Sequence, residues 1–315
     1  MAYLGEGFAK LILFGEHAVV HGRAAVAFAL PGRSIKARWI PGSGSLEARA
    51  PAGYEADVAK AFAAVAEALA LPERGGLVEA DGNIPPEAGF GSSGALCAAL
   101  ARAAGAARAA AGKPASIEEL WAAANAAERA FHGNPSGVDT GLALLGGFRR
   151  IEPRPAFPPG VETLERPGPV LVVAAAPRVA SCKVSVAAVG RAVKAGEARA
   201  LAAIEALGDL SDEAWLALRN GPWDAALAAR IGQLARRAQE RLDGLGLSTP
   251  ELDALIGAGE AAGATGGKLS GGGAGGAFWL AAKNRADAGR VAEAVRAAAA
   301  KLGLSLPFGP EVLRP

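Results

Sequence analysis

The stretch PPEAGFGSSGALCAALARAAG, residues 85–105, combines a glycine-rich turn with a long alanine-rich helix pattern. Three glycines lead directly into the helix, and the hydroxyls of Ser92 and Ser93 stand at its start. The first turn of a helix carries unpaired N–H groups and partial positive charge, and glycines let the backbone wrap closely around phosphate oxygens. The stretch therefore predicts a phosphate-binding helix N-terminus, with an ordinary glycine-rich helix cap as the alternative.

The same stretch also satisfies the spacing GxGxxG, but a dinucleotide-binding fold is disfavoured. Two prolines precede the glycines where a buried strand is required, and no clear acidic residue ends a second strand about 20 residues later. A second match, in KLSGGGAGGAFWLAAK (residues 268–283), leads into a strand-like run and not into a helix. A Rossmann oxidoreductase is therefore a weak alternative. The sequence also contains no Walker A loop and no HRD or DFG triplet.

The glycines around Ala274 in that second segment predict a backbone that another chain segment or a ligand approaches closely. The alternative for this segment is a flexible connector.

The three histidines of the chain lie in two polar, glycine-bearing segments. His17 and His21 occur in LFGEHAVVHG (residues 13–22), and His132 occurs in AERAFHGNPSGVD (residues 127–139). The spacing of the first two would suit zinc, but no third ligand follows at a recognisable distance, so a zinc site is disfavoured. The concentration of so few histidines in two such segments favours a functional role.

Two carboxylates accompany the predicted phosphate loop. Glu128 ends an apolar helix pattern, where taken alone it would be a solvated helix residue, and Asp139 lies between two glycines. Mg²⁺ prefers oxygen ligands, a nucleophilic hydroxyl needs a proton acceptor, and developing phosphate charge needs a cation, for which Lys10 is a candidate. Together with the serine hydroxyls, these groups indicate phosphoryl transfer.

Apolar periodicity predicts an α+β fold without internal repeats. The first fifty residues indicate a strand-rich sheet, with strands at 10–14, at RSIKARWI (33–40) and at SLEARA (45–50). Helices are predicted at 57–71, 92–111, 116–131, several within 181–242, and at 250–262 and 286–301, with buried strands PVLVVAAAP and GAFWLAA. The proline-rich stretch at 151–169 marks a domain junction, so we expect domains at 1–165 and 166–315.

Composition narrows the function classes. With 315 residues, 51% of them hydrophobic, the chain is long enough for two packed domains and too apolar for a disordered segment. The net charge of +2 is not concentrated in any run, so neither nucleic acid nor a membrane is expected as a partner. Cys97 and Cys182 match no disulfide pattern, and no apolar run could span a bilayer, which indicates a cytoplasmic protein.

Three segments together resemble the motifs of the GHMP kinase superfamily, which includes galactokinases, homoserine kinases and mevalonate kinases. They occur in the family's order: KLILFGEHAVVHG (10–22), PPEAGFGSSGA (85–95) and KLSGGGAGG (268–276). GEHAVVHG and ERAFHGNPSGVD are similar to the mevalonate kinases in particular. The resemblance covers nearly the whole chain. It implies a two-domain GHMP kinase fold with the active site in the interdomain cleft, ATP-dependent phosphorylation of (R)-mevalonate to 5-phosphomevalonate, and a homodimer, which members often form.

The resemblance also implies roles for single residues. Asp139 matches the catalytic base that accepts the C5 hydroxyl proton of mevalonate, and Lys10 matches the lysine paired with that base. Glu16 and His17 match residues on the mevalonate side of the site. The implied Mg²⁺ ligands are Ser93 and Glu128. The implied cradle for the ATP phosphates consists of Gly89, Phe90, Gly91, Ser92, Ser93 and Gly94.

The chain departs from the family pattern at a few positions. Phe90 and Gly94 stand where Leu and Ala are commoner, and Ser181 and Cys182 occupy a helix start that is usually rich in threonine. Two alternatives remain open. One is a GHMP kinase that acts on another small hydroxyl compound or on a phosphorylated mevalonate, and the other is a non-catalytic GHMP-fold binding protein.

Overall fold

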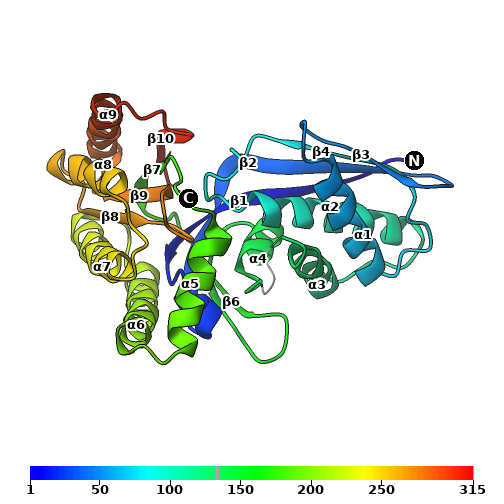
Figure 1. Cartoon of the computed structure of the whole chain (residues 1–315), viewed down its shortest axis with the longest axis horizontal. Coiled ribbons are helices and arrows are strands. Elements are labelled where there is room, and N and C mark those ends of the chain that lie inside the picture. The colour runs from blue at the N-terminus through cyan, green and yellow to red at the C-terminus, as the bar shows by residue number, and fades with distance from the viewer. Residues whose placement is uncertain (132–134, 315) are drawn as a thin grey trace.

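The computed structural model of the chain describes residues 1–131 and 135–314. In this part of the chain the strands form two separate sheets, which lie beside each other along the long axis of the molecule (Figure 1). The first sheet uses strands between residues 3 and 163, and the second uses strands between residues 170 and 313. Helices and largely antiparallel strands are combined in each half, so the α+β class is confirmed.

The first sheet has six strands in the described residues. They are β1 (Tyr3–Phe14), β2 (Ala25–Pro41), β3 (Leu46–Arg49), β4 (Gly76–Gly82), β5 (Phe148–Glu152) and β6 (Gly160–Thr163). The spatial order is β3, β4, β2, β5, β6, and β1 pairs with β2 along most of its length. The long β2 organises this sheet, because its first part pairs with β5 and its last part pairs with β4.

Helices of the first half pack on one face of this sheet (Figure 1). Helices α1 (Glu55–Ala68), α2 (Ser92–Ala110) and α4 (Val138–Leu145) contact the sheet, and α3 (Ile117–Glu128) packs on these three helices. The contact of α2 with β1 depends on small residues, since a Cβ on Gly5 or on Gly7 would lie 2.0 Å from a carbonyl oxygen of the helix. The backbones of α2 and β1 therefore approach closely, which places the N-terminus of α2 beside the middle of β1.

The second sheet has the order β10, β7, β9, β8, and all of its pairs are antiparallel. Its strands are β7 (Val170–Ala176), β8 (Gly266–Leu269), β9 (Gly276–Ala282) and β10 (Phe308–Leu313). Every residue of β7 and β9 is buried, as their continuous apolar runs predict for strands covered on both faces.

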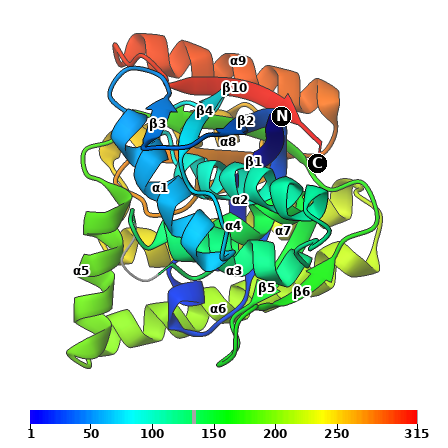
Figure 2. The same cartoon turned by 90° about the vertical axis from the view of Figure 1, so that its right-hand side faces the viewer.

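The helices of the second half are α5 (Cys182–Lys194), α6 (Ala198–Asn220), α7 (Ala225–Gly244), α8 (Pro250–Ala261) and α9 (Arg285–Lys301). Helices α7, α8 and α9 pack on the second sheet, with α9 beside β10 at the edge of the molecule (Figure 2). Among the helices of the described ranges, none has the length and the apolar content needed to cross a membrane.

Local signals predicted several helix ends correctly. Ser116 and Glu119 exchange side-chain to backbone hydrogen bonds, which confirms the capping box at the start of α3. Thr249 caps α8 through a hydrogen bond from Leu252, as predicted from the Thr-Pro pair.

The first two strands of the first sheet were predicted too short. The first strand was expected at residues 10–14, but β1 begins at Tyr3 because its early residues pair with Ser34–Trp39 of β2. The second strand was expected at residues 33–40, but β2 already begins at Ala25. Both extensions depend on a partner strand that local periodicity does not reveal.

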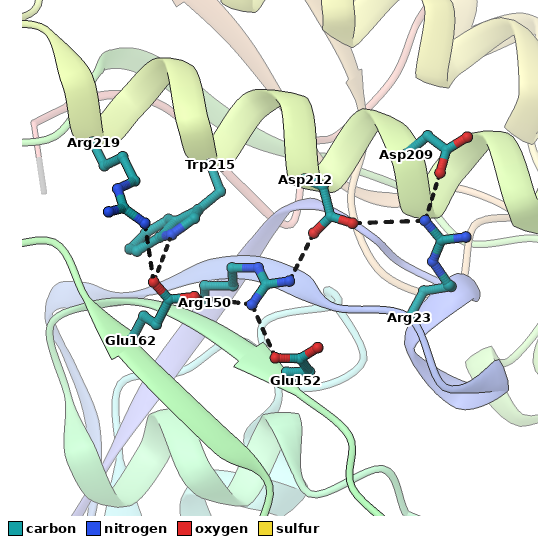
Figure 3. A network of polar contacts seen from close by, with 8 residues as sticks. All are labelled: Arg23, Arg150, Glu152, Glu162, Asp209, Asp212, Trp215 and Arg219. Carbon is teal, nitrogen blue, oxygen red and sulfur yellow. Dashed lines mark hydrogen bonds and ion pairs between the residues drawn. The ribbon is translucent and has the colours of Figure 1, made fainter.

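Helix α6 is joined to the first half by a group of polar residues that we call the α6 network (Figure 3). Asp212 lies between two arginines of the first half: its Oδ1 accepts a 2.8 Å hydrogen bond from Arg150, and its Oδ2 lies 3.6 Å from Arg23. The indole of Trp215 donates to Glu162 at 3.2 Å. The network comprises Arg23, Arg150, Glu152, Glu162, Asp209, Asp212, Trp215 and Arg219.

Candidate active site

Lys10 of β1 and Asp139 of α4 form an ion pair beside the start of α2. The Lys10 Nζ lies 3.2 Å from Asp139 Oδ1. The lysine side chain is 5% exposed and the aspartate side chain is 32% exposed. The carboxylate is therefore accessible, whereas the ammonium that pairs with it is buried. This arrangement suits a group that accepts a proton from a bound hydroxyl compound.

The glycines of the phosphate loop make room for this ion pair. A Cβ on Gly91 would lie 2.9 Å from Lys10 Cε, and a Cβ on Gly94 would lie 2.9 Å from Asp139 Cβ. Gly91 also has a left-handed backbone, with φ 72°, which suits glycine. The loop glycines therefore leave the space that the two charged side chains occupy.

The structure brings all six residues predicted for the phosphate cradle to the start of α2, but Phe90 contributes only its backbone there. The Phe90 ring is buried and lies 4.6 Å from the Phe308 ring of β10, centroid to centroid. Its carbonyl oxygen accepts a 2.9 Å hydrogen bond from the Lys10 backbone N–H. Phe90 thus anchors the loop in the core, and Gly89, with φ 98°, turns the chain before it.

Ser93 and Glu128 lie together, as predicted. The Ser93 hydroxyl donates a 2.8 Å hydrogen bond to Glu128 Oε1. Burial, and next the negative charge of Asp139, raise the pKa of Glu128 to about 8, while the hydrogen bond from Ser93 opposes that shift. A divalent cation would relieve the repulsion between the two carboxylates, and their oxygens with the serine hydroxyl are ligands that Mg²⁺ accepts, so these residues fit it.

The metal would need further ligands beyond these side chains. Within the described ranges, no group of three or more His, Cys, Asp or Glu side chains could hold a metal ion. Mg²⁺ commonly keeps only one or two carboxylates and completes its shell with water and substrate phosphates. Ser93 and Glu128 would therefore have to be supplemented by water and phosphate oxygens to complete the shell of such an ion.

The first and third motifs meet in a buried contact that we call the motif seam, between residues 12–17 and 268–272. The Ile12 backbone N–H donates a 3.1 Å hydrogen bond to the Ser270 hydroxyl. The Lys268 ammonium forms an ion pair with Glu16 Oε1. Glu16 and Lys268 are 1% and 0% exposed. The glycines around Ala274, predicted to be approached closely by another part of the chain, are approached by Leu247 and by Pro177 and Arg178, and only the start of this segment meets the first motif.

His17 belongs to the motif seam and carries no charge at neutral pH. Burial lowers the pKa of His17 to about 4, although a hydrogen bond with the backbone of Gly272 opposes that shift. His17 precedes the short 3₁₀ helix η1 (Ala18–His21) and has a positive φ of 59°, which is uncommon for histidine. A neutral imidazole can hydrogen-bond a hydroxyl but offers no charge to a carboxylate. His132 lies outside the described residues.

Sequence reasoning missed Arg178, which follows β7 and lies between the phosphate loop and the third motif. Its Nη1 donates a 3.0 Å hydrogen bond to the carbonyl oxygen of Gly273. A Cβ on Gly89 would lie 2.8 Å from Arg178 Nη2, and a Cβ on Gly276 would lie 2.6 Å from it. Glycines of both motifs therefore accommodate one guanidinium. Only the packing of the second sheet against the loop reveals this, since no local pattern surrounds the arginine.

Cys182 lies next to the third motif, at the first residue of α5. A Cβ on Gly272 would lie 2.4 Å from its sulfur, and burial raises the pKa of its thiol. The preceding residue, Ser181, caps α5 by accepting a hydrogen bond from Val184. The helix start that departs from the family pattern is thus part of the site's surroundings.

Comparison with known proteins identifies the family to which this chain is similar. The model of the GHMP kinases N terminal domain matches residues 56–147, and that of the GHMP kinases C terminal domain matches residues 225–301. Mevalonate kinase of Pyrococcus horikoshii is 30% identical over 90% of this chain and 89% of that protein. Mevalonate kinase of Aeropyrum pernix is 31% identical over 85% and 84%.

A solved structure gives the same fold. The crystal structure of L. major mevalonate kinase in complex with R-mevalonate superposes with a TM-score of 0.77 at 24% identity, and covers 99% of this chain and 94% of that one. At this identity the likeness establishes the two-part fold.

Proposed function

Because the chain belongs to the GHMP kinase family, we propose that it transfers the γ-phosphoryl group of ATP to the terminal hydroxyl of (R)-mevalonate. The product is 5-phosphomevalonate. The observation that carries this proposal is the Lys10–Asp139 ion pair at the N-terminus of α2, where a proton acceptor and a phosphate-binding helix start adjoin. Similarity to the archaeal mevalonate kinases over most of the chain supports mevalonate as the acceptor.

Asp139 is the proton acceptor in the proposed reaction. As the mevalonate hydroxyl oxygen bonds to the γ-phosphorus, its proton passes to the Asp139 carboxylate, and the bond between that phosphorus and the bridging oxygen of ADP breaks. Lys10 lies within ion-pair distance of the same carboxylate, so it orients Asp139 and stabilises negative charge on the attacking oxygen. The N–H groups of the first turn of α2 hold the ATP phosphates.

Ser93 and Glu128 would hold Mg²⁺, and Arg178 would supply a second cation on the opposite side of the loop. Bound Mg²⁺ would neutralise charge on the phosphates. The Arg178 guanidinium already lies against Gly89 of the phosphate loop, within reach of an anion bound there. A planar guanidinium is well suited to phosphate oxygens because its N–H donors form a rigid fork.

His17 and Glu16 belong to the mevalonate side of the site in this proposal. The Nε2 of His17 is buried and has no hydrogen-bond partner among the described residues, so a mevalonate hydroxyl bound against it would satisfy a hydrogen bond that the protein leaves unmade. Glu16 is engaged with Lys268, and its role is developed below.

We also propose that the two domains meet near residue 165, since the first sheet ends at Thr163 and the second begins at Val170. A cytoplasmic location agrees with the two free cysteines, Cys97 and Cys182. A homodimer, frequent in the family, is proposed from the resemblance, and light scattering of the purified protein tests it.

An acceptor panel tests the proposed function. ADP release is measured with (R)-mevalonate, 5-phosphomevalonate, galactose and homoserine, each with Mg-ATP. We expect kcat/KM for mevalonate to exceed the others by about tenfold or more, a gap of about 1.4 kcal/mol. A higher kcat/KM for 5-phosphomevalonate or a sugar than for mevalonate would contradict mevalonate as the substrate, but not the assignment as a kinase.

A further inference from the structure

We propose that Glu16 is a positioning residue. Its carboxylate forms an ion pair with Lys268 of the third motif, and this pair holds the neighbouring His17 in the orientation that binds mevalonate. Glu16 therefore acts on the substrate through His17 and not by direct contact. The kinetic part of this inference rests on the proposed mevalonate kinase function. The structural part, an energetic coupling between residues 252 positions apart, does not depend on the substrate.

The ion pair is enclosed by protein on all sides. Lys268 is 0% exposed and Glu16 is 1% exposed. The Lys268 Nζ lies 5.9 Å from the centroid of the Phe14 ring and 5.8 Å from that of the Trp279 ring, and the two rings contact each other edge to face. The ammonium also donates to the carbonyl oxygen of Leu269. The pair is thus built into an aromatic pocket at the end of β1.

Each charge of the pair depends on the other. Burial raises the pKa of Glu16 and lowers the pKa of Lys268, and the mutual attraction opposes both shifts. Removing one partner from such a pair leaves an uncompensated buried charge, whereas replacing both by uncharged side chains of similar size is often neutral. This asymmetry makes the pair testable by a double substitution.

The pair is one of three consecutive connections between the first and third motifs. Ile12 bonds to Ser270, Glu16 pairs with Lys268, and the His17 ring bonds to the backbone of Gly272. His17 has a positive φ of 59°, a strained conformation for a residue with a side chain, which surrounding contacts must maintain. The Glu16 pair lies immediately before that strained residue and so restrains where its ring points.

One observation favours a competing role. The second carboxylate oxygen of Glu16, Oε2, is buried without a hydrogen-bond partner among the described residues, so it would accept a hydrogen bond from a substrate group if the surrounding side chains moved to admit one. The two roles differ in what happens when both charges are removed. A positioning pair can be replaced by an uncharged pair, whereas a carboxylate that binds substrate cannot.

The test is a double-mutant cycle with Glu16→Gln, Lys268→Met and the combined variant. Asp212→Asn, in the partly exposed α6 network, is the control for the loss of a carboxylate charge outside the seam. Unfolding by urea and KM for mevalonate and for ATP are measured for each. We expect each single variant to raise KM for mevalonate by about tenfold, with KM for ATP within about twofold, because His17 shifts while the phosphate loop does not. The combined variant should recover to within about threefold of the unmodified chain.

The outcomes separate the alternatives. A combined variant as impaired for mevalonate as Glu16→Gln overturns the proposal and assigns Glu16 to substrate contact. If the single variants do not fold, the combined variant decides alone: near-normal KM supports the pair and a raised KM overturns it. Single effects on unfolding that simply add also overturn it, whatever the substrate. If the unmodified enzyme releases no ADP with mevalonate, the proposed function is contradicted. The double-mutant cycle measured by urea unfolding then still tests the Glu16–Lys268 pair.

Discussion

The motif seam and the α6 network both join the first half of the chain to the second, yet they do so in opposite ways. The seam has one ion pair, between side chains that are 1% and 0% exposed. The α6 network has several, and their side chains range from 14% exposed at Arg150 to 69% at Asp209. The network contains more charges, but water and salt screen them, whereas the seam is shielded from both.

The number of ion pairs between two parts of a chain therefore does not measure the free energy that joins them. An exposed pair contributes about 0–1 kcal/mol, because side-chain entropy and solvent offset most of the attraction. A buried pair adds little net stability over an apolar replacement but costs about 3–5 kcal/mol when one partner is lost. The seam therefore specifies a geometry, and it does so beside the residues proposed to bind mevalonate.

Among the three substitutions compared below, the largest effect is expected at His17, as a dependence of stability on pH. As the pH falls, the unfolded chain takes up a proton on this histidine near 6.5, whereas the folded protein resists until about pH 4. Stability is therefore lost between pH 6.5 and pH 4, by about 3 kcal/mol for this one group. His17→Asn removes the titrating group and should lose less stability over that range, as measured by urea unfolding at each pH.

The His17 prediction isolates the seam, because the α6 network is the same in the unmodified protein and in His17→Asn. Equal pH slopes for the two proteins would mean that His17 titrates normally and is not buried in the seam.

A smaller effect is expected from Ser270→Ala. The substitution removes the acceptor of the Ile12 backbone N–H, and a buried N–H left without a partner costs about 1–3 kcal/mol. The matched control is Ser116→Ala, which removes the acceptor of the Glu119 backbone N–H at the exposed start of α3 and should cost about half as much or less, because water can solvate the freed N–H. Thermal unfolding of both variants measures the difference, and equal losses would contradict the ranking of the two sites.

The smallest effect is expected in the α6 network. Asp212→Asn weakens two contacts with arginines, but we expect a loss of less than about 1 kcal/mol, because these side chains are partly solvated. In about 0.5 M salt the loss should shrink further, since screening reduces what the charged form contributes. A loss of stability above about 2 kcal/mol that does not depend on salt would contradict the distinction, because the network would then behave like the buried seam.

The sequence predicted those parts of the site that depend on local patterns. The phosphate loop, Lys10 beside the first strand, and Asp139 after a glycine are each recognisable within a few residues, and the structure brings them together. The same holds for Ser93 and Glu128, which are linked by a hydrogen bond.

The remaining features depend on packing between distant segments. Lys268 meets Glu16 only because the second sheet lies against the end of β1, and Arg178 meets two glycine motifs for the same reason. The pattern that marked Glu16 as polar and functional gave no sign that its carboxylate would be enclosed with a lysine. Phe90 likewise has its ring in the core because of Phe308, which stands more than two hundred residues later in the sequence.

The central claim is that Asp139 is the proton acceptor of a mevalonate kinase. The most direct test compares ADP release by the unmodified protein and by Asp139→Asn, with (R)-mevalonate and Mg-ATP each varied while the other is saturating. The substitution keeps the size of the side chain and removes the acceptor, so kcat should fall by about 10²- to 10⁴-fold with little change in KM for ATP. Mevalonate-dependent turnover that stays within a few-fold of normal in Asp139→Asn would contradict the account.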